Sequence, residues 1–199
     1  MRALDFFFEF ASTYSYPCAM RADIEAAKRG VTLNWRPFLL GPIFAAQNWT
    51  TSPFNLYPAK GRYMWREMER LCEAQRLPFA PPDPFPQNSL LAARVATAVE
   101  DEHRPQVARL IYRLEFGEGL DISKPETIAR ALRSAGLDAE SYLERAAQQE
   151  TKDKLRATTD AAIKAGVFGA PSFVAPDGEL YWGNDRLEAA LDWAAAFRE

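Results

Sequence analysis

FEFASTYSYP, residues 8–17, decides the fold because a strand becomes a helix within this stretch. Residues 3–11 form an aromatic-rich run that is too continuous for an edge strand, which predicts a buried strand. Residues 13–29 follow with apolar side chains at helical spacing, and Gly30 predicts the end of that helix. The small and hydroxylated side chains at the junction are typical of a helix cap and also of an enzyme site at a helix start.

A second strand follows this helix. Residues 31–38 place Val31, Leu33 and Trp35 on one face, which is the alternation of a strand. A helical connection between two strands implies a parallel pair with a right-handed crossover. The N-terminal part is therefore predicted to be a β-α-β unit.

The middle of the chain is expected to lack strands. Residues 39–59 contain three prolines and several aromatics without a period, which predicts a long, ordered and functional loop. Helical stripes then follow one another as far as residue 165. Ser123 with Glu126 predicts a capping box at the start of one of these helices.

The C-terminal stretch returns to strands. Residues 169–175 and 179–183, joined by a Pro-Asp-Gly turn, predict a β-hairpin, and Asn184 is expected to cap a last helix. Neither β segment makes a stable sheet alone, so the two are expected to pair.

The order of the elements indicates an α/β protein, a thioredoxin-like fold with an inserted all-helical domain. The predicted thioredoxin-like domain comprises residues 1–40 and 166–199. Residues 41–165 comprise the loop and the inserted helical domain.

Composition excludes several function classes. The 199 residues carry a formal net charge of -3, so no overall basic field attracts nucleic acid or an anionic membrane. No stretch approaches the roughly 20 apolar residues of a membrane span. The N-terminus lacks a signal-peptide pattern, so a cytoplasmic protein is expected. Cys18 and Cys72 are expected to be buried and inert, and no spacing of Cys, His and carboxylates predicts a metal site.

Three stretches carry a family resemblance. STYS at 12–15 resembles the S-P-Y-S motif of kappa-class glutathione transferases, GVFGAP at 166–171 resembles the turn before their cis-proline, and GNDRL at 183–187 is similar to their glutathione-binding motif. The three motifs occur in order, and the resemblance covers essentially the whole chain. Within this superfamily the chain most resembles the 2-hydroxychromene-2-carboxylate isomerases, which are glutathione-dependent enzymes of aromatic hydrocarbon catabolism.

This resemblance implies glutathione as the cofactor, a small aromatic substrate and a homodimer. DsbA-type disulfide oxidoreductases share the fold but begin this helix with C-x-x-C, whereas Ser12 and Ser15 stand at both positions here. Without a vicinal dithiol the chain cannot cycle a disulfide at that site. Thr13 replaces the family's usual proline, which leaves a freer turn.

Ser12 has a physical reason to act on a thiol. Backbone N–H groups at a helix start are unpaired and carry partial positive charge, so they stabilise an anion. A hydroxyl there can donate a hydrogen bond to the sulfur of glutathione and lower the pKa of that thiol. Ser12 is therefore predicted to be catalytic and glutathione-binding, and a plain serine cap is the alternative.

The other glutathione contacts are implied by the resemblance alone. A cis bond before Pro171 is expected to present the backbone of Ala170 to the cysteine of glutathione. Asn184 and Asp185 are both expected to bind glutathione, and Asp185 is expected to receive the γ-glutamyl ammonium group. Lys60 is expected to meet the glycine carboxylate.

The substrate-binding residues are expected mainly in the long region after the second strand. Aromatic walls for a flat substrate and polar groups for its oxygens are expected from Tyr14, Phe44, Asn48, Trp49, Asn55 and Arg36. For the aromatic residues, packing is the alternative role.

The expected activity is conversion of 2-hydroxychromene-2-carboxylate-type acids to trans-o-hydroxybenzylidenepyruvate-type isomers through a glutathione thiolate stabilised by Ser12. One alternative is a kappa-like glutathione transferase or peroxidase that uses the same thiolate. The other is a non-catalytic thiol- or peptide-binding protein with a thioredoxin-like fold.

Overall fold

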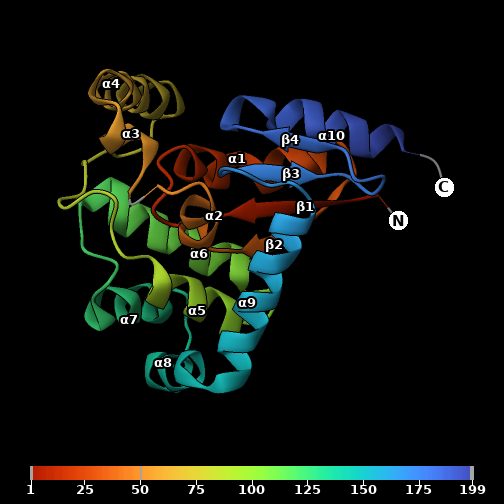
Figure 1. Cartoon of the computed structure of the whole chain (residues 1–199). Coiled ribbons are helices and arrows are strands. Elements are labelled where there is room, and N and C mark those ends of the chain that lie inside the picture. Colours follow the sequence, from red (N-terminus) through yellow and green to blue (C-terminus); the bar gives the residue numbers. More distant parts are fainter. Residues whose placement is uncertain (1, 50, 198–199) are drawn as a thin grey trace.

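The computed structural model describes residues 2–49 and 51–197, which fold around a mixed sheet of four strands (Figure 1). The strands are β1 (Ala3–Phe8), β2 (Thr32–Pro37), β3 (Ser172–Val174) and β4 (Leu180–Trp182). Their order is β2-β1-β3-β4, in which β1 is parallel to β2, and β3 is antiparallel to both β1 and β4. The β segments from the two ends of the chain therefore pair, as the sequence predicts.

β1 is buried on both faces, which explains its unbroken aromatic run. Phe6 and Phe8 belong to the larger hydrophobic cluster, and Phe7 belongs to a smaller cluster. Phe6 packs against Trp35 of β2 and Phe173 of β3, with ring centroids 4.8 and 5.2 Å apart. Because side chains alternate along a strand, a strand covered on both faces needs apolar residues at consecutive positions.

Helices cover the sheet (Figure 1). α1 (Ser15–Lys28) and α10 (Leu187–Ala196) pack against each other and contribute to the larger cluster. α9 (Gln149–Lys164) contacts β2, and its Ala162 lies in the smaller cluster with Phe7. This arrangement confirms the predicted thioredoxin-like α/β fold.

The middle of the chain is helical. It contains α4 (Pro58–Gln75), α5 (Leu90–Ala98), α6 (Arg104–Tyr112), the π-helical segment η1 (Arg113–Gly117), α7 (Pro125–Ser134) and α8 (Ala139–Ala147). The predicted capping box is wrong, because α7 begins at Pro125 after Lys124 and has no side-chain cap. The Ser123 backbone N–H instead donates to the Asp121 carboxylate at 2.9 Å, so Asp121 organises this turn.

Residues 39–59 were expected to be an aperiodic loop, and this is wrong in part. They contain two short helices, α2 (Leu40–Ala46) and α3 (Pro53–Leu56), of 7 and 4 residues. Pro53 opens α3, and the Ser52 hydroxyl accepts a hydrogen bond from the Phe54 N–H at 3.3 Å. Helices this short show no periodicity in sequence.

One hydrophobic cluster joins the sheet to the helical block. It contains Phe6 and Phe173 of the sheet together with Ile111 of α6 and Ile128 of α7. The division into a thioredoxin-like domain and an inserted domain, at the predicted boundaries, remains a prediction. In the described part of the chain, no helix combines the length and the hydropathy that a membrane crossing requires.

Candidate active site

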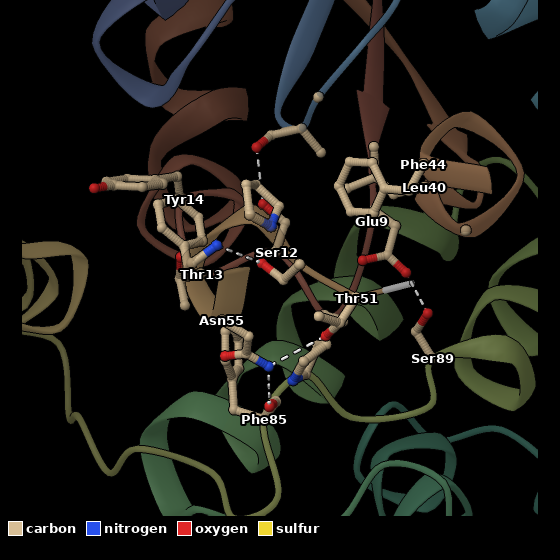
Figure 2. Close-up of a pocket in the computed structure, with 18 of the residues that line it drawn as sticks. Glu9, Ser12, Thr13, Tyr14, Leu40, Phe44, Thr51, Asn55, Phe85 and Ser89 are labelled. Atoms are coloured by element: carbon tan, nitrogen blue, oxygen red, sulfur yellow. Dashed lines mark hydrogen bonds between the residues drawn. The ribbon is translucent and has the colours of Figure 1, made fainter. Parts of the chain in front are cut away.

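A cavity of about 1470 Å³ lies where the end of β1 turns towards α1. Its lining comes from the turn at residues 9–14, the α2–α4 region, the segment 85–90, and residues 168–170 and 182–185. Figure 2 shows Ser12 with Tyr14 on one side in this view and Glu9 on the other. The three stretches that carry the family resemblance therefore contribute to one cavity.

Ser12 links the two halves of this site. Its hydroxyl donates a hydrogen bond of 2.8 Å to the backbone carbonyl of Ala170, and only 9% of the residue is exposed. The Ser12 backbone N–H donates to the carbonyl of Glu9 at 3.1 Å, which fixes the turn after β1. Helix α1 begins at Ser15 rather than at residue 13, because residues 13–14 belong to this turn.

The turn leaves two amides available to a ligand. The N–H groups of Ser15 and Tyr16 donate to the carbonyls of Ser12 and Thr13 at 3.1 and 3.2 Å. Within residues 2–49 and 51–197, the N–H groups of Thr13 and Tyr14 have no hydrogen-bond acceptor. Both precede the first turn of α1, where the partial positive charge of the helix favours an anion.

The bond between Ala170 and Pro171 is cis, as the resemblance implies. Ala170 lines the cavity, and the carbonyl of Pro171 accepts a hydrogen bond of 2.9 Å from the N–H of Gly183. The backbone before the cis-proline and the turn that carries Asp185 are thus held to each other.

Lys60 also lines the cavity, from the first turn of α4. Its Nζ lies 4.8 Å from the centroid of the Tyr57 ring, which is a cation–π contact. The structure thus places Lys60 at the cavity, and its contact with an anionic ligand stays a prediction.

Asn184 lines the cavity, but the prediction that it caps α10 is wrong. Asn184–Arg186 form a 3-10 turn, and α10 begins at Leu187 without a side-chain cap. The Arg21 guanidinium of α1 donates to the side-chain oxygen of Asn184 at 3.1 Å and to its backbone oxygen at 2.6 Å. Asn184 is thus an anchor between the last turn and α1.

Asp185 follows this anchor and lines the cavity with a side chain that is 72% exposed. Its carboxylate lies 3.2 Å from the Arg186 guanidinium. Gly183 has φ +121°, and a Cβ there would lie 2.6 Å from Asp185 Oδ1. Glycine at this position therefore permits the close approach of the carboxylate.

Four of the expected substrate-binding residues line the cavity: Tyr14, Phe44, Trp49 and Asn55. The rings of Phe44 and Trp49 pack with centroids 5.6 Å apart, and Tyr14 packs against Phe54 at 6.1 Å. The Asn55 amide donates to Thr51 Oγ1 at 3.2 Å and to the carbonyl of Phe85 at 3.0 Å, so it ties α3 to the 85–90 segment (Figure 2).

The other two expected substrate-binding residues do not line this cavity. Arg36 pairs with Asp5 at 3.3 Å and lines a separate cavity of about 310 Å³. It lies on β2 and is not among the residues that line the large cavity, so its assignment to the substrate site stays a prediction that the structure does not support. Asn48 has φ +59° and is not among the residues that line the large cavity, so its assignment there also stays a prediction that the structure does not support. Its left-handed backbone ends the turn after α2.

Neither cysteine is placed to act as a nucleophile. Cys18 and Cys72 are buried and unpaired, and neither lines the large cavity. Burial raises the pKa of the Cys18 thiol to about 12 and that of the Cys72 thiol to about 11. Both thiols are therefore protonated at neutral pH, which confirms the expectation of inert cysteines.

Sequence reasoning missed Glu9. It is 4% exposed and lines the cavity, and its carboxylate accepts a hydrogen bond from the Ser89 hydroxyl. Burial raises the pKa of the Glu9 carboxyl to about 7, against a smaller lowering by the Ser89 hydroxyl and the Ala11 backbone. The signal in the sequence was a single acid inside the aromatic run FFFEF.

Comparison with known proteins finds relatives that are named as glutathione transferases and relatives that are named as isomerases. Human glutathione S-transferase kappa 1 is 30% identical over 94% of this chain and 88% of its own length. A 2-hydroxychromene-2-carboxylate isomerase of Sphingobium xenophagum is 27% identical over 94% of this chain and 95% of its own length.

Solved structures share the fold over nearly the whole chain. A 2-hydroxychromene-2-carboxylate isomerase has a TM-score of 0.85 at 22% identity, covering 96% of this chain and 95% of that chain. The cytosolic disulfide reductase DsbM from Pseudomonas aeruginosa with GSH has a TM-score of 0.66 at 12% identity, covering 97% and 96%. A family model described as a DSBA-like thioredoxin domain matches residues 3–193. The chain therefore belongs to the DsbA-like thioredoxin family.

Proposed function

We propose that this protein is a glutathione-dependent isomerase that converts 2-hydroxychromene-2-carboxylate-type acids into trans-o-hydroxybenzylidenepyruvate-type products in aromatic catabolism. The observation that carries the proposal is the 2.8 Å hydrogen bond from the Ser12 hydroxyl to the Ala170 carbonyl. It brings a hydroxyl, two available amides and the backbone before a cis-proline to one wall of a large cavity.

Among residues 2–49 and 51–197, no sulfur-bearing side chain lines this cavity. Serines stand at positions 12 and 15, where a disulfide oxidoreductase of this fold carries cysteines, and both cysteines of the chain lie outside the lining. When bound, glutathione would supply a thiolate nucleophile for reversible addition to a conjugated carbon of the substrate, which would permit rotation about the neighbouring carbon–carbon bond. Because serines replace the cysteines at this wall and both thiols of the chain are buried elsewhere, the nucleophile has to come from a bound thiol.

The residues on this wall fit a thiolate. The Ser12 hydroxyl and the N–H groups of Thr13 and Tyr14 are donors, and three donors converging on an anion favour its charged form. Ser12 has a single hydroxyl proton, so donation to a sulfur atom requires release of the Ala170 carbonyl. That carbonyl then becomes free to accept a hydrogen bond from an incoming peptide N–H.

The charges around the wall fit the two ends of glutathione. Lys60 would bind the glycine carboxylate, and Asp185 would bind the γ-glutamyl ammonium group, beside the anchor that Asn184 makes with Arg21. The two residues come from α4 and from the last turn, which border the same cavity. A tripeptide with a carboxylate at one end and an ammonium group at the other complements this arrangement.

The rest of the cavity fits a flat aromatic acid. Phe44, Trp49 and Phe54 present ring surfaces, and Asn55 and Thr51 add polar groups among them. Ring surfaces stabilise an aromatic substrate through apolar burial and aromatic packing, and they exclude water from the reacting atoms.

A kappa-like glutathione transferase is the second candidate, favoured by the 30% identity to human glutathione S-transferase kappa 1. The two activities differ in the fate of the thiol, because an isomerase returns glutathione and a transferase consumes it. Purified protein should therefore be incubated with a panel of chromene carboxylates, with and without glutathione. Product isomer and remaining free thiol are then measured together.

An isomerase forms product only with glutathione present and leaves the free thiol unchanged over many turnovers. Loss of one thiol for each product formed would instead support the transferase. If no product forms with any substrate of the panel, the remaining interpretation is a non-catalytic binding protein. A homodimer in the cytoplasm belongs to the same proposal, and light scattering of the purified protein tests the oligomeric state.

A further inference from the structure

Glu9 is a buried acid with access to the cavity. It directly follows β1, and it is 4% exposed although it is one of the lining residues. Its backbone carbonyl accepts hydrogen bonds from the Ser12 N–H at 3.1 Å and from the Tyr112 hydroxyl at 2.9 Å. Two donors therefore hold the backbone of Glu9 in the same turn as Ser12.

The side chain of Glu9 is also held in place. The Ser89 hydroxyl, just before α5, donates to its Oε1, and Figure 2 shows the Glu9 carboxylate between the Ser12 and Ser89 side chains in this view. A carboxyl fixed by a hydroxyl on one side and open to a cavity on the other is arranged for proton exchange rather than for an ion pair.

The groups packed around Glu9 are neutral or acidic. Ser89 and Tyr112 are uncharged, and the nearby Glu115 of η1 is fully buried with no hydrogen-bond partner for either carboxyl oxygen in the described residues. Repulsion from Glu9 contributes to raising the pKa of Glu115 well above its ordinary value, after burial. Across residues 2–49 and 51–197, no positive charge contributes to the pKa of Glu9.

We propose that Glu9 is the proton-exchanging residue of this cavity, acting on the carbonyl oxygen of a conjugated keto acid. The inference rests on the proposed function and deepens it by assigning proton transfer to Glu9, with the ring-opened form of the substrate, an α,β-unsaturated keto acid, as the compound on which it acts. Burial places the pKa of the Glu9 carboxyl at about 7, so both the protonated and the charged form are populated near neutral pH. A group that must first give and then recover a proton works best under that condition.

The proton balance closes without any other reagent. When a nucleophile adds to the far carbon of the conjugated system, the π electrons move to the carbonyl oxygen. The O–H bond of Glu9 breaks with its electron pair left on the carboxylate, and the proton joins that oxygen. On the return step the Glu9 carboxylate removes the proton, the C=O bond forms again, and the nucleophile leaves with its bonding pair.

The test compares wild type with Glu9→Gln and with the matched control Glu67→Gln. Glu67 lines the same cavity, but its carboxylate pairs with Arg70. The first readout uses protein without ligand, in which infrared difference spectroscopy follows carboxyl titration. We expect a carboxyl that titrates near pH 7 in wild type and Glu67→Gln, and its loss in Glu9→Gln.

The second readout is a ratio of two glutathione-dependent rates. Addition to a conjugated aryl ketone places charge on an oxygen, whereas substitution on an aryl halide expels the halide and requires no proton on oxygen. We expect Glu9→Gln to lower the ratio of ketone to halide rate by roughly 100-fold and to remove the fall in the ketone rate above pH 7. Glu67→Gln should keep the ratio within about twofold.

The possible outcomes separate this inference from the proposed function. An unchanged ratio in Glu9→Gln, or the absence of a carboxyl titrating near pH 7, would overturn the role of Glu9 and leave the isomerase proposal standing. Equal loss of both rates together with glutathione affinity would assign Glu9 a structural role and also overturn it. If wild type lacks isomerase activity but Glu9→Gln still lowers the ratio of ketone to halide rate, the isomerase proposal alone is overturned. If wild type reacts with neither the ketone nor the halide, both proposals are overturned.

Discussion

The Ser12 hydroxyl and the Ala170 carbonyl, 158 residues apart in the chain, are joined by a hydrogen bond of 2.8 Å. The bond closes the site by connecting the turn after β1 to the peptide before the cis-proline. It also occupies the only hydroxyl proton of Ser12, so a ligand that accepts from Ser12 has to replace the carbonyl. In the proposed function, the atoms that join these two segments in the free protein are also the atoms that receive the thiol.

Replacement of Ser12 by alanine is expected to lower kcat/KM for glutathione-dependent turnover by roughly 10- to 100-fold. A hydrogen bond to a charged group is worth about 1.5 to 3 kcal/mol, and the Thr13 and Tyr14 amides remain. Ser15→Ala is the matched control, because Ser15 is fully buried and lies outside the lining. Equal losses in the two variants would contradict a specific role for Ser12.

Lys60→Met is expected to raise KM for glutathione by about 5- to 10-fold with a smaller effect on kcat, because an exposed charge-assisted contact contributes about 1 kcal/mol. The difference from wild type should shrink as salt is added. Arg66→Met is the control, since Arg66 lies on the same helix, pairs with Glu69 and does not line the cavity. An unchanged KM in Lys60→Met would remove Lys60 from the site.

Asn184→Ala is expected to reduce the free energy of unfolding by about 1 to 2 kcal/mol, because it removes a buried acceptor of the Arg21 guanidinium. Loss of this anchor should also loosen the turn that carries Asp185 and weaken glutathione binding. Urea denaturation measures the first effect and calorimetric titration with glutathione the second. Normal stability in Asn184→Ala would show that Arg21 does not depend on this side chain.

Glu9 is expected to make stability depend on pH. Its folded-state pKa of about 7 lies above the ordinary value of 4.5, so the folded state binds more protons than the unfolded state between these values. The contribution of Glu9 protonation to the free energy of unfolding is complete below pH 4.5 and is lost as pH rises through 7. Each tenfold difference in proton affinity between the folded and unfolded states corresponds to about 1.4 kcal/mol. The free energy of unfolding of wild type should therefore fall relative to that of Glu9→Gln over this window. Parallel pH profiles would place the pKa of Glu9 at its ordinary value.

The fold was largely readable from sequence because its signals are local and strong. The run that places Phe6, Phe7 and Phe8 in two clusters can only be a strand covered on both faces, and the small residues after it mark a turn. The short helices α2 and α3 were not predictable, because a helix of 4 or 7 residues is stabilised by tertiary contacts rather than by a period.

The candidate site was readable only where a motif fixes the backbone. Ser12, Ala170 and Asp185 were assigned from three motifs that resemble those of a known family, and the structure brings the three motifs to one cavity. Arg36 was included because sequence does not show which cavity an arginine lines, and in the structure it lines the smaller one. Asn184 was misread as a cap because the competing partner, Arg21, is distant in sequence.

The most direct test of the central claim, a borrowed thiolate held at Ser12, is the pKa of the glutathione thiol when it is bound to the protein. Ultraviolet difference spectroscopy follows the thiolate over a pH titration of wild type and of Ser12→Ala with saturating glutathione. The account predicts a thiolate near neutral pH in wild type and an upward shift of that pKa in Ser12→Ala. Glutathione that fails to bind wild type, or that binds and keeps the thiol pKa it has free in solution, would contradict it.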